Sequence, residues 1–394
     1  MSQPITTLTV ATDALVPQLA RLVHFAFGSP LDMCEGWLKR SPVQNLRAVM
    51  EGDTAVACLL RIPMAQFWGG RAVPMVGIAG VAVAPERRGC GLARGMMQAC
   101  VREMADEGVA LSALYASTQS LYRQCGYEQA GSFCELQASI SQFAGGAPGP
   151  AVRALSPETD HDAIRECYQR WAPMWDGSLD RGQYIWDRIH NKRGTLFQPF
   201  GIYENGLTAY VFINQAREAS SGRHDVQISD MAWTTPSAGK ALLSFLAGFA
   251  TMGEHVVFSG SPSHPLVHLM QGVRINPVKL EHWMIRVLRL QMALEARGYN
   301  PGLTAACELA VHDDLVPANR GTWRVEVEGG RARVSPGRGG NALHVGPRGL
   351  AAIYSGRLGA AQAALNGLAE GSPAAVRAAE AIFPAGAPWC ADFF

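Results

Sequence analysis

The stretch VAVAPERRGCGLAR, residues 81–94, has the residue types and spacing best suited to chemistry in this chain. Arg88–Ala93 fits the pattern R-x-x-G-x-A, and it lies between an apolar run typical of a strand and a run with helical periodicity. Glycines let the backbone approach a ligand closely, and the free N–H groups at the N-terminus of a helix attract anions. Arg87, Arg88 and Arg94 add positive charge around such an anion. The stretch therefore predicts a site for a pyrophosphate group.

Other phosphate-binding patterns do not fit this turn. It lacks the Lys-Ser/Thr pair of G-x-x-x-x-G-K-[ST], and it is not G-x-G-x-x-G followed by a ribose-binding acid. The simpler alternative is a helix that starts at glycine and carries surface arginines. The apolar run VAVAP directly before the turn, and the partner segment that follows it, favour the ligand site over that alternative.

The partner segment is LYASTQSLYRQCGYEQAG, residues 114–131. A strand-like run leads into a short polar stretch, and then Tyr122 is followed by Gly126 and Tyr127 in the pattern Y-x-x-x-G-Y. A tyrosine hydroxyl, with an ordinary pKa of about 10, can act as a proton donor if it is held within reach of a reacting group. The alternative for Tyr122 is a core side chain that packs the start of a helix, and we interpret Tyr127 as packing.

The elements that must position these residues form three blocks of mixed α/β character. A Gly-, Ala- and Pro-rich linker at 143–153 ends the first block, and the third block begins near Trp283. Hairpins are predicted around Gly52-Asp53, around Glu204-Asn205-Gly206 and around Gly329-Gly330. Helical periodicity covers, among other segments, 92–107, 161–175, 239–250 and three Ala-rich stretches near the carboxyl end, at 349–355, 357–368 and 373–383.

Composition limits the classes of function. The chain has 394 residues, 48% of them apolar, and a formal net charge of +1, which indicates no electrostatic surface for nucleic acid or for a membrane. We find no signal peptide and no transmembrane run, and the nine scattered cysteines are typical of small buried apolar residues in a reducing compartment. A cytoplasmic protein is therefore expected. The ten histidines show no metal-ligand spacing, so no metal is expected.

The motifs resemble those of the GCN5-related N-acetyltransferase (GNAT) superfamily, in which R-x-x-G-x-G/A binds acetyl-CoA pyrophosphate and Y-x-x-x-G-[FY] follows. Further segments occur in the order expected of the enhanced intracellular survival (Eis) family of bacterial N-acetyltransferases, and the resemblance covers nearly the whole chain. These segments are VRALSP, YQRWAP, GSLDRGQYIW, LEARGYNPG and the carboxyl-terminal DFF. The turn departs from the family in one respect, since Gly89 and Cys90 stand where more arginines are frequent.

The resemblance implies an α/β (α+β) fold in three domains. These are an acetyltransferase domain at 1–145 with the acetyl-CoA site, a second GNAT-like domain at 150–283 without a cofactor motif, and a sterol-carrier-protein-like domain at 284–394. It also implies a homohexamer that acts on a small cationic amine of the aminoglycoside or polyamine type. Cofactor contacts are expected from Val81, Ala82, Val83, Arg88, Gly89, Cys90, Gly91, Leu92, Ala93, Arg94, Ser117 and Thr118.

The resemblance also assigns two catalytic roles. Tyr122 occupies the position of the family's general acid, and the main-chain carboxylate of Phe394 corresponds to its general base, with Phe393 and Phe394 as the apolar anchor of the segment. Asp392 is a further candidate for attracting a cationic substrate. The acceptor pocket is expected at 24–39, lined by Phe25, Phe27, Asp32, Glu35 and Trp37, although aromatic residues at helical spacing also fit a core.

Two other functions remain open from the sequence. The chain could acetylate lysine on a protein or peptide, or it could be a lipid-binding protein without enzymatic activity. The intact turn at Arg88–Ala93 and the presence of Tyr122 favour acetyl transfer to a small amine.

Overall fold

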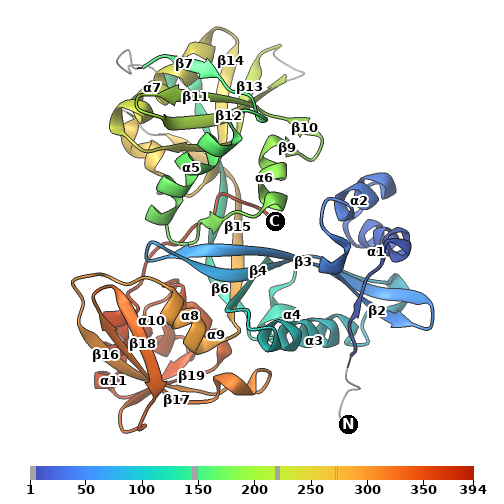
Figure 1. Ribbon diagram of the computed structural model, residues 1–394, viewed down its shortest axis with the longest axis vertical. Coiled ribbons are helices and arrows are strands. Elements are labelled where there is room, and N and C mark those ends of the chain that lie inside the picture. Colours follow the sequence, from blue (N-terminus) through green and yellow to red (C-terminus); the bar gives the residue numbers. More distant parts are fainter. Residues whose placement is uncertain (1–5, 144–149, 218–221, 271, 273) are drawn as a thin grey trace. The chain divides into compact units, whose positions relative to one another are not determined.

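The computed structural model describes residues 6–143, 150–217, 222–270, 272 and 274–394 (Figure 1). The linker predicted at 143–153 falls mostly outside these residues. No helix among them combines the length and the apolar character needed to cross a bilayer.

The described chain forms two compact units, and each is discontinuous in sequence. Unit 1 contains the residues up to Gly131, residues 282–388 and Phe394, whereas unit 2 contains residues 132–281 and 389–393. Both units mix helices with sheets, as the sequence predicted.

Unit 1 begins with a sheet in the order β1-β2-β3-β4-β5-β15, of which β15 contributes its last residues, from His282. Its strands are β1 (Thr9–Val10), β2 (Leu46–Glu51), β3 (Thr54–Trp68), β4 (Arg71–Val83), β5 (Leu111–Tyr115) and β15 (Ile275–Val287). The helices are α1 (Val16–Phe27), α2 (Leu31–Leu38), α3 (Leu92–Asp106) and α4 (Gln119–Arg123). The hairpin predicted around Gly52-Asp53 is confirmed, because it joins β2 to β3.

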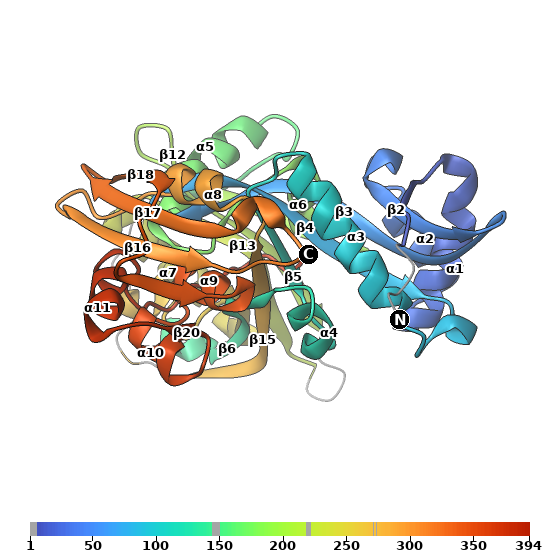
Figure 2. The ribbon, with the colours of Figure 1, turned by 90° about the horizontal axis from the view of Figure 1, so that it is seen from below.

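The apolar stripe of α3 attaches this helix to the sheet. Met96, Met97, Cys100, Val101 and Met104 recur at spacings of one, three or four residues and are all fully buried. They share one core cluster with side chains of the strands β3 and β4. Figure 2 shows α3 running alongside these two strands. Packing therefore fixes the direction in which the N-terminus of α3 points.

A second sheet completes unit 1, in the order β18-β17-β16-β19-β20. The strands are β16 (Ala305–Val311), β17 (Gly321–Glu328), β18 (Arg331–Pro336), β19 (Ala342–Val345) and β20 (Ala369–Glu370). The helices are α8 (Leu290–Ala296), α9 (Pro347–Tyr354), α10 (Ala360–Leu365) and α11 (Pro373–Ile382). The hairpin predicted around Gly329-Gly330 is confirmed, and both glycines have positive φ, at 55° and 76°.

Unit 2 is built on strands in the order β6-β14-β13-β12-β11-β7. These are β6 (Glu128–Ser139), β14 (Gly253–Gly260), β13 (His224–Trp233), β12 (Leu207–Arg217), β11 (Gln198–Tyr203) and β7 (Val152–Ala154). Short strands are β8 (Leu179–Asp180), β9 (Asn191–Lys192) and β10 (Thr195–Leu196), and the helices are α5 (His161–Trp171), α6 (Gln183–His190) and α7 (Pro236–Ala247). The hairpin predicted around Asn205-Gly206 is confirmed between β11 and β12.

The segment 389–393 belongs to unit 2. The N–H of Trp389 donates to the carbonyl of Asp176 at 3.1 Å, and the N–H of Cys390 donates to the carbonyl of Ser132 at 3.0 Å. The indole of Trp389 packs on Trp171 and His264. The residues that precede Phe394 are therefore held by backbone bonds and by an aromatic cluster.

Candidate functional site

The strands β4 and β5 separate before β4 ends. They pair in parallel only from Met75↔Leu111 to Ile78↔Leu114, yet β4 continues to Val83. Gly80 has φ of 59°, and the register of β4 with β3 shifts at this point. Such a bulge bends a strand away from its neighbour. Beyond Ile78, the β5-facing edge of β4 therefore presents backbone groups for which β5 offers no partner.

Val81–Val83, which are expected to contact the cofactor, lie on the part of β4 beyond its pairing with β5. Val81 and Val83 are half-buried, and Ala82 between them is buried. Backbone N–H and C=O groups need hydrogen-bond partners, so an extended ligand with amides fits this edge. The role of Val81–Val83 in holding the cofactor stays a prediction.

The turn with the predicted pyrophosphate site, Arg88–Ala93, comes shortly after the end of β4. A single 3-10 turn, Pro85–Arg87, leads to Gly89 and Gly91, which have φ of 80° and 82°, and Gly91 precedes the first residue of α3. Residues 85–90 are exposed, and no side chain of the described residues caps α3. The first N–H groups of a 15-residue helix are therefore free for an anion.

The three arginines are arranged around this turn by different partners. Arg88 donates to the carbonyls of Val83 at 3.4 Å and of Phe25 at 3.1 Å, and Arg94 donates to Oε1 of Gln124 at 3.0 Å. Arg87 pairs with Glu51. The bond from Arg94 joins the start of α3 to the residue that follows α4, so the two predicted motifs lie side by side.

Tyr122 lies on α4 within the core that α3 and β4 share. Its side chain is 6% exposed and meets Tyr127 edge-on, with ring centroids 6.2 Å apart. Val81, Val83 and Leu92 pack against the same cluster. The Tyr122 hydroxyl makes no hydrogen bond to any residue that the structure describes. Burial raises the pKa of Tyr122 to about 12, so the phenol keeps its proton at neutral pH.

Phe394 lies on the β4–β5 pair at the point where the strands separate. Its ring meets Tyr115 edge-on with centroids 5.4 Å apart, and the residue is 8% exposed. A Cβ placed on Gly77 would approach two atoms of this ring to 2.8 and 2.9 Å. Gly77 pairs with Ala113, one residue before the last β4–β5 pair. The sequence singled out neither Gly77 nor Tyr115, because only the fold shows that they form the seat of Phe394.

Asp392 is held by an ion pair within unit 2. Its carboxylate accepts from Nε of Arg181 at 3.0 Å, while Arg181 also forms two bonds with Asp230, at 2.6 and 2.8 Å. All three side chains are buried. Burial raises the pKa of Asp392, and Arg181 opposes that rise. Its burial and its bond to Arg181 argue against a direct contact with substrate, and the attraction of a cationic substrate by Asp392 stays a prediction.

The predicted acceptor residues divide into two groups. Phe25 and Phe27 are 55% and 53% exposed, and Trp37 lies against the bulge, since a Cβ on Gly80 would meet its ring at 2.5 Å. Asp32 is exposed, but Glu35 pairs with Lys39 at 2.6 Å. The structure therefore brings Trp37 next to the separated strand and leaves the two phenylalanines open.

Ser117 and Thr118 are exposed between β5 and α4, and Thr118 directly precedes the first residue of α4.

The sequence analysis missed Gly80, although the sequence contained a signal for it. A glycine inside an apolar strand, as in GIAGVAV, indicates a bulge or a close approach.

Family models match the chain in three segments. An acetyltransferase (GNAT) domain matches residues 8–130, a second acetyltransferase (GNAT) domain matches 177–289, and a sterol carrier protein domain matches 290–391. The N-acetyltransferase Eis of Mycobacterium tuberculosis is 27% identical over 299 residues, covering 72% of this chain and 71% of that protein. The chain is an Eis-like member of the GNAT superfamily.

Further relatives support the same assignment. An uncharacterized N-acetyltransferase of Streptomyces avermitilis is 26% identical over 92% of this chain and 93% of its own length. The crystal structure of a GCN5-related N-acetyltransferase from Anabaena variabilis matches with a TM-score of 0.93 and 29% identity, covering 98% of this chain and 100% of that one. The fold of Eis1 from Mycobacterium abscessus is also similar, with a TM-score of 0.78 at 20% identity over 99% and 100% of the two chains.

This Eis-like chain is an N-acetyltransferase, with two GNAT domains followed by a domain like those of sterol carrier proteins. Acetyltransferases of the superfamily use acetyl-CoA. The alternative of a lipid-binding protein without enzymatic activity is therefore wrong.

Proposed function

We propose that this Eis-like enzyme transfers the acetyl group of acetyl-CoA directly to a primary amine of a small cationic molecule, of the aminoglycoside or polyamine type. The supporting observation is the seat of Phe394 on the β4–β5 pair, directly before the strands separate. It brings the residue of the proposed base to the edge at which the pantetheine arm is expected.

The residues present fit acetyl-CoA. The edge of β4 beyond its pairing with β5, at Val81–Val83, suits the amides of pantetheine, and the N-terminus of α3, which no described side chain caps, suits the pyrophosphate with Arg88 and Arg94 nearby. A backbone N–H of this edge can also polarise the acetyl carbonyl. Ser117 and Thr118 remain predicted contacts at the end of β5.

Three proton transfers complete the reaction, because the nitrogen loses one proton before it attacks and a second after the C–N bond forms, and the leaving sulfur gains one. An alkylammonium has a pKa of about 10 and must lose a proton before its nitrogen can attack the carbonyl carbon. We assign the acceptance of that proton to the carboxylate of Phe394. The C–S bond then breaks, and Tyr122 donates its phenolic proton to the leaving thiolate. A pKa of about 12 keeps Tyr122 protonated at neutral pH. It lies above the pKa of a thiol, about 8.5, so the tyrosinate has to recover a proton at once, and the second proton lost by the nitrogen supplies it.

The exposed side chains of Phe25, Phe27 and Asp32 support an acceptor site along α1 and α2. Glu35 contributes less negative charge than the sequence suggested, because Lys39 neutralises it. Acetylation of a lysine side chain on a peptide uses the same chemistry and remains the second candidate.

Release of the CoA thiol in the presence of different amines tests the proposal. The panel contains spermidine, kanamycin, a lysine-containing peptide and an amine-free control. We expect saturable thiol release with the polyamine or the aminoglycoside, and N-acetylated product by mass spectrometry. Turnover of the peptide alone would overturn the small-molecule assignment, and the absence of turnover with every amine would contradict amine acetylation as a whole.

A further inference from the structure

The helix α4, which carries Tyr122, is too short to be stable by itself. It has five residues, and no side chain of the described residues caps its N-terminus. Helix formation is cooperative, so such a turn depends on contacts made by its surroundings. Some of those contacts come from α3 and β4, and others come from residues more than 150 positions later in the sequence, in β15 and in the sterol-carrier-like domain.

Arg286, a residue of β15, supports the chain directly after α4. It stands opposite Ser112 in the β15–β5 pair, and Ser112 accepts a hydrogen bond from the Tyr127 hydroxyl at 2.8 Å. Residues paired across two strands project from the same face of a sheet. Gly126 lies directly on the guanidinium, because a Cβ added there would meet Nη1 of Arg286 at 2.7 Å and Cβ of Pro347 at 2.8 Å.

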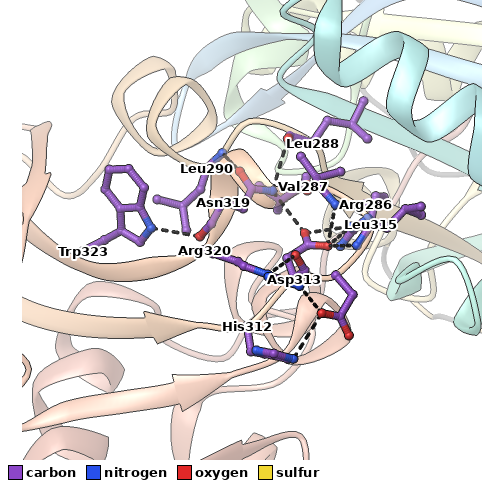
Figure 3. A network of polar contacts seen from close by, with 12 residues as sticks. Arg286, Val287, Leu288, Leu290, His312, Asp313, Leu315, Asn319, Arg320 and Trp323 are labelled. Atoms are coloured by element: carbon purple, nitrogen blue, oxygen red, sulfur yellow. Dashed lines mark hydrogen bonds and ion pairs between the residues drawn. The ribbon is translucent and has the colours of Figure 1, made fainter.

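The guanidinium of Arg286 is itself fixed (Figure 3). Its Nη2 donates to both carboxylate oxygens of Asp313, each at 2.7 Å, and both side chains are fully buried. Asp313 also accepts from the N–H of Val316 at 3.0 Å and from Nδ2 of Asn319 at 3.2 Å. A buried ion pair is tolerated only with such additional bonds, so Arg286 cannot shift without leaving a charge unpaired. Its Nε and Nη1 are buried without a hydrogen-bond partner among the described residues, so the pair with Asp313 holds the guanidinium beneath Gly126 through Nη2 alone.

A second ion-pair chain reaches α4 through Glu128. The buried carboxylate accepts from Arg123, the last residue of α4, at 2.8 Å and from Arg348, on α9, at 2.6 Å. Burial would raise the pKa of Glu128, but the bonds from Arg123, from the N–H of Gln129 and from Arg348 hold that pKa below its ordinary value. Glu128 thus joins α4 to α9 as a carboxylate.

We infer that the sterol-carrier-like domain and the end of β15 act as a clamp on the catalytic turn, formed by Arg286, Asp313, Glu128 and Arg348. In this arrangement Arg286 and Arg348 are positioning residues for Tyr122. The inference rests on the proposed role of Tyr122 as the acid. A general acid must lie within hydrogen-bond reach of the atom it protonates, and a misplacement of about 1 Å can lower the rate roughly 100-fold.

Arg348→Gln tests the clamp with the least risk to folding, because the Arg348 side chain is 40% exposed. It removes the charged contact with Glu128 from α9. We expect kcat to fall about tenfold or more, with KM for acetyl-CoA nearly unchanged, since α4 moves while the arginine turn does not. Arg348→Lys should recover part of the loss.

Arg324→Gln is the matched control. It breaks the exposed pair with Glu326, at 2.9 Å, in the same domain and should leave kcat unchanged. Arg286→Lys is a second clamp variant that keeps a positive charge beside Asp313. Its folding is checked by thermal unfolding, and its kcat is expected to fall while KM for acetyl-CoA stays near the wild-type value.

A double-mutant comparison separates positioning from general damage. In a Tyr122→Phe enzyme, Arg348→Gln should cause little further loss of kcat, because the group that it positions is already gone. Wild-type kcat in Arg348→Gln, or an equal loss in both backgrounds, would overturn the clamp alone. Full turnover of Tyr122→Phe by itself would instead overturn the proposed acid, and the inference with it.

Discussion

The ring of Phe394 meets the ring of Tyr115 edge-on, with centroids 5.4 Å apart and ring planes inclined at 73°. Tyr115 is the last residue of β5, and Gly77, which lies beneath Phe394, belongs to the last stretch of β4 that still pairs with β5. An apolar contact of this kind fixes a side chain and, with it, the carboxylate on the same residue. This relationship leads to measurable predictions for the chain end and for Gly77, and separate observations do so for Tyr122 and His264.

Extending the chain by Gly-Ser after Phe394 keeps the aromatic contact and moves the terminal carboxylate away. We expect kcat to fall at least about 100-fold, the usual size of a lost general base, with an unchanged unfolding temperature. The same dipeptide inserted after Ser2, far from this contact in sequence, is the control. Normal turnover of the extended enzyme would remove the carboxylate from the mechanism.

Tyr122→Phe should lower kcat by about 100-fold to 10,000-fold and leave the Kd for acetyl-CoA nearly unchanged. Because burial raises the pKa of Tyr122 to about 12, its protonated form persists to high pH. The wild-type kcat should therefore show no decline caused by this phenol between about pH 7 and 10. Stopped assays across this range, together with calorimetric titration of acetyl-CoA, measure both. A comparable loss of affinity would indicate a structural residue.

Gly77→Ala should displace Phe394, because the new methyl group would lie 2.8 Å from its ring, while the end of the flexible Met64 side chain, which lies closer still, has to move as well. We expect kcat to fall about tenfold or more with little change in KM for acetyl-CoA. Gly248→Ala is the control, since a Cβ there meets no atom within 4 Å and its φ is −59°. Equal kcat values for the two variants would show that the seat of Phe394 is irrelevant to catalysis.

Stability should fall on acidification because of His264. Burial lowers the pKa of His264 to about 3, so the folded chain keeps this ring neutral where the unfolded chain protonates it. The contribution of the neutral His264 ring to the free energy of unfolding is complete above about pH 6.5. Below that value it decreases by about 1.4 kcal/mol for each pH unit.

Urea unfolding at about pH 7 and pH 5, compared between the wild type and His264→Phe, measures this effect. The wild type should lose about 2 kcal/mol more than the variant over this interval. His264 packs among Trp171, Trp233 and Trp389, so tryptophan fluorescence follows the transition. Equal losses in the two proteins would show that His264 is protonated without unfolding.

Local patterns predicted the elements that carry the site. The hairpin at Gly52-Asp53, the strand that ends at Val83 and the helix that begins at Leu92 each follow from turn residues or from apolar periodicity, which act over a few residues. The relation of the Arg88 turn to Tyr122 followed from motif order. Their proximity is explained by a bond that the sequence cannot show, from Arg94 to Gln124.

Long-range contacts could not be predicted in this way. Gly77 and Tyr115 are ordinary strand residues until Phe394, nearly 300 positions later, packs against them. The sequence offered Asp392 as a candidate for attracting a cationic substrate, but it could not show the burial of this side chain against Arg181, which lies in another segment. Pairing between distant segments depends on the tertiary fold, and no local propensity encodes it.

The antiparallel pairing of β5 with β15 limits how this enzyme can be dissected. Residues Leu111–Tyr115 are hydrogen-bonded to Trp283–Val287, so a fragment that stops near Gly131 would leave β5 without this neighbour. An open, apolar sheet edge recruits other strands and aggregates. The segment that carries the predicted catalytic motifs should therefore not fold properly when it is transferred alone. Exchange of acetyltransferase domains between such proteins has to include residues on both sides of the intervening unit.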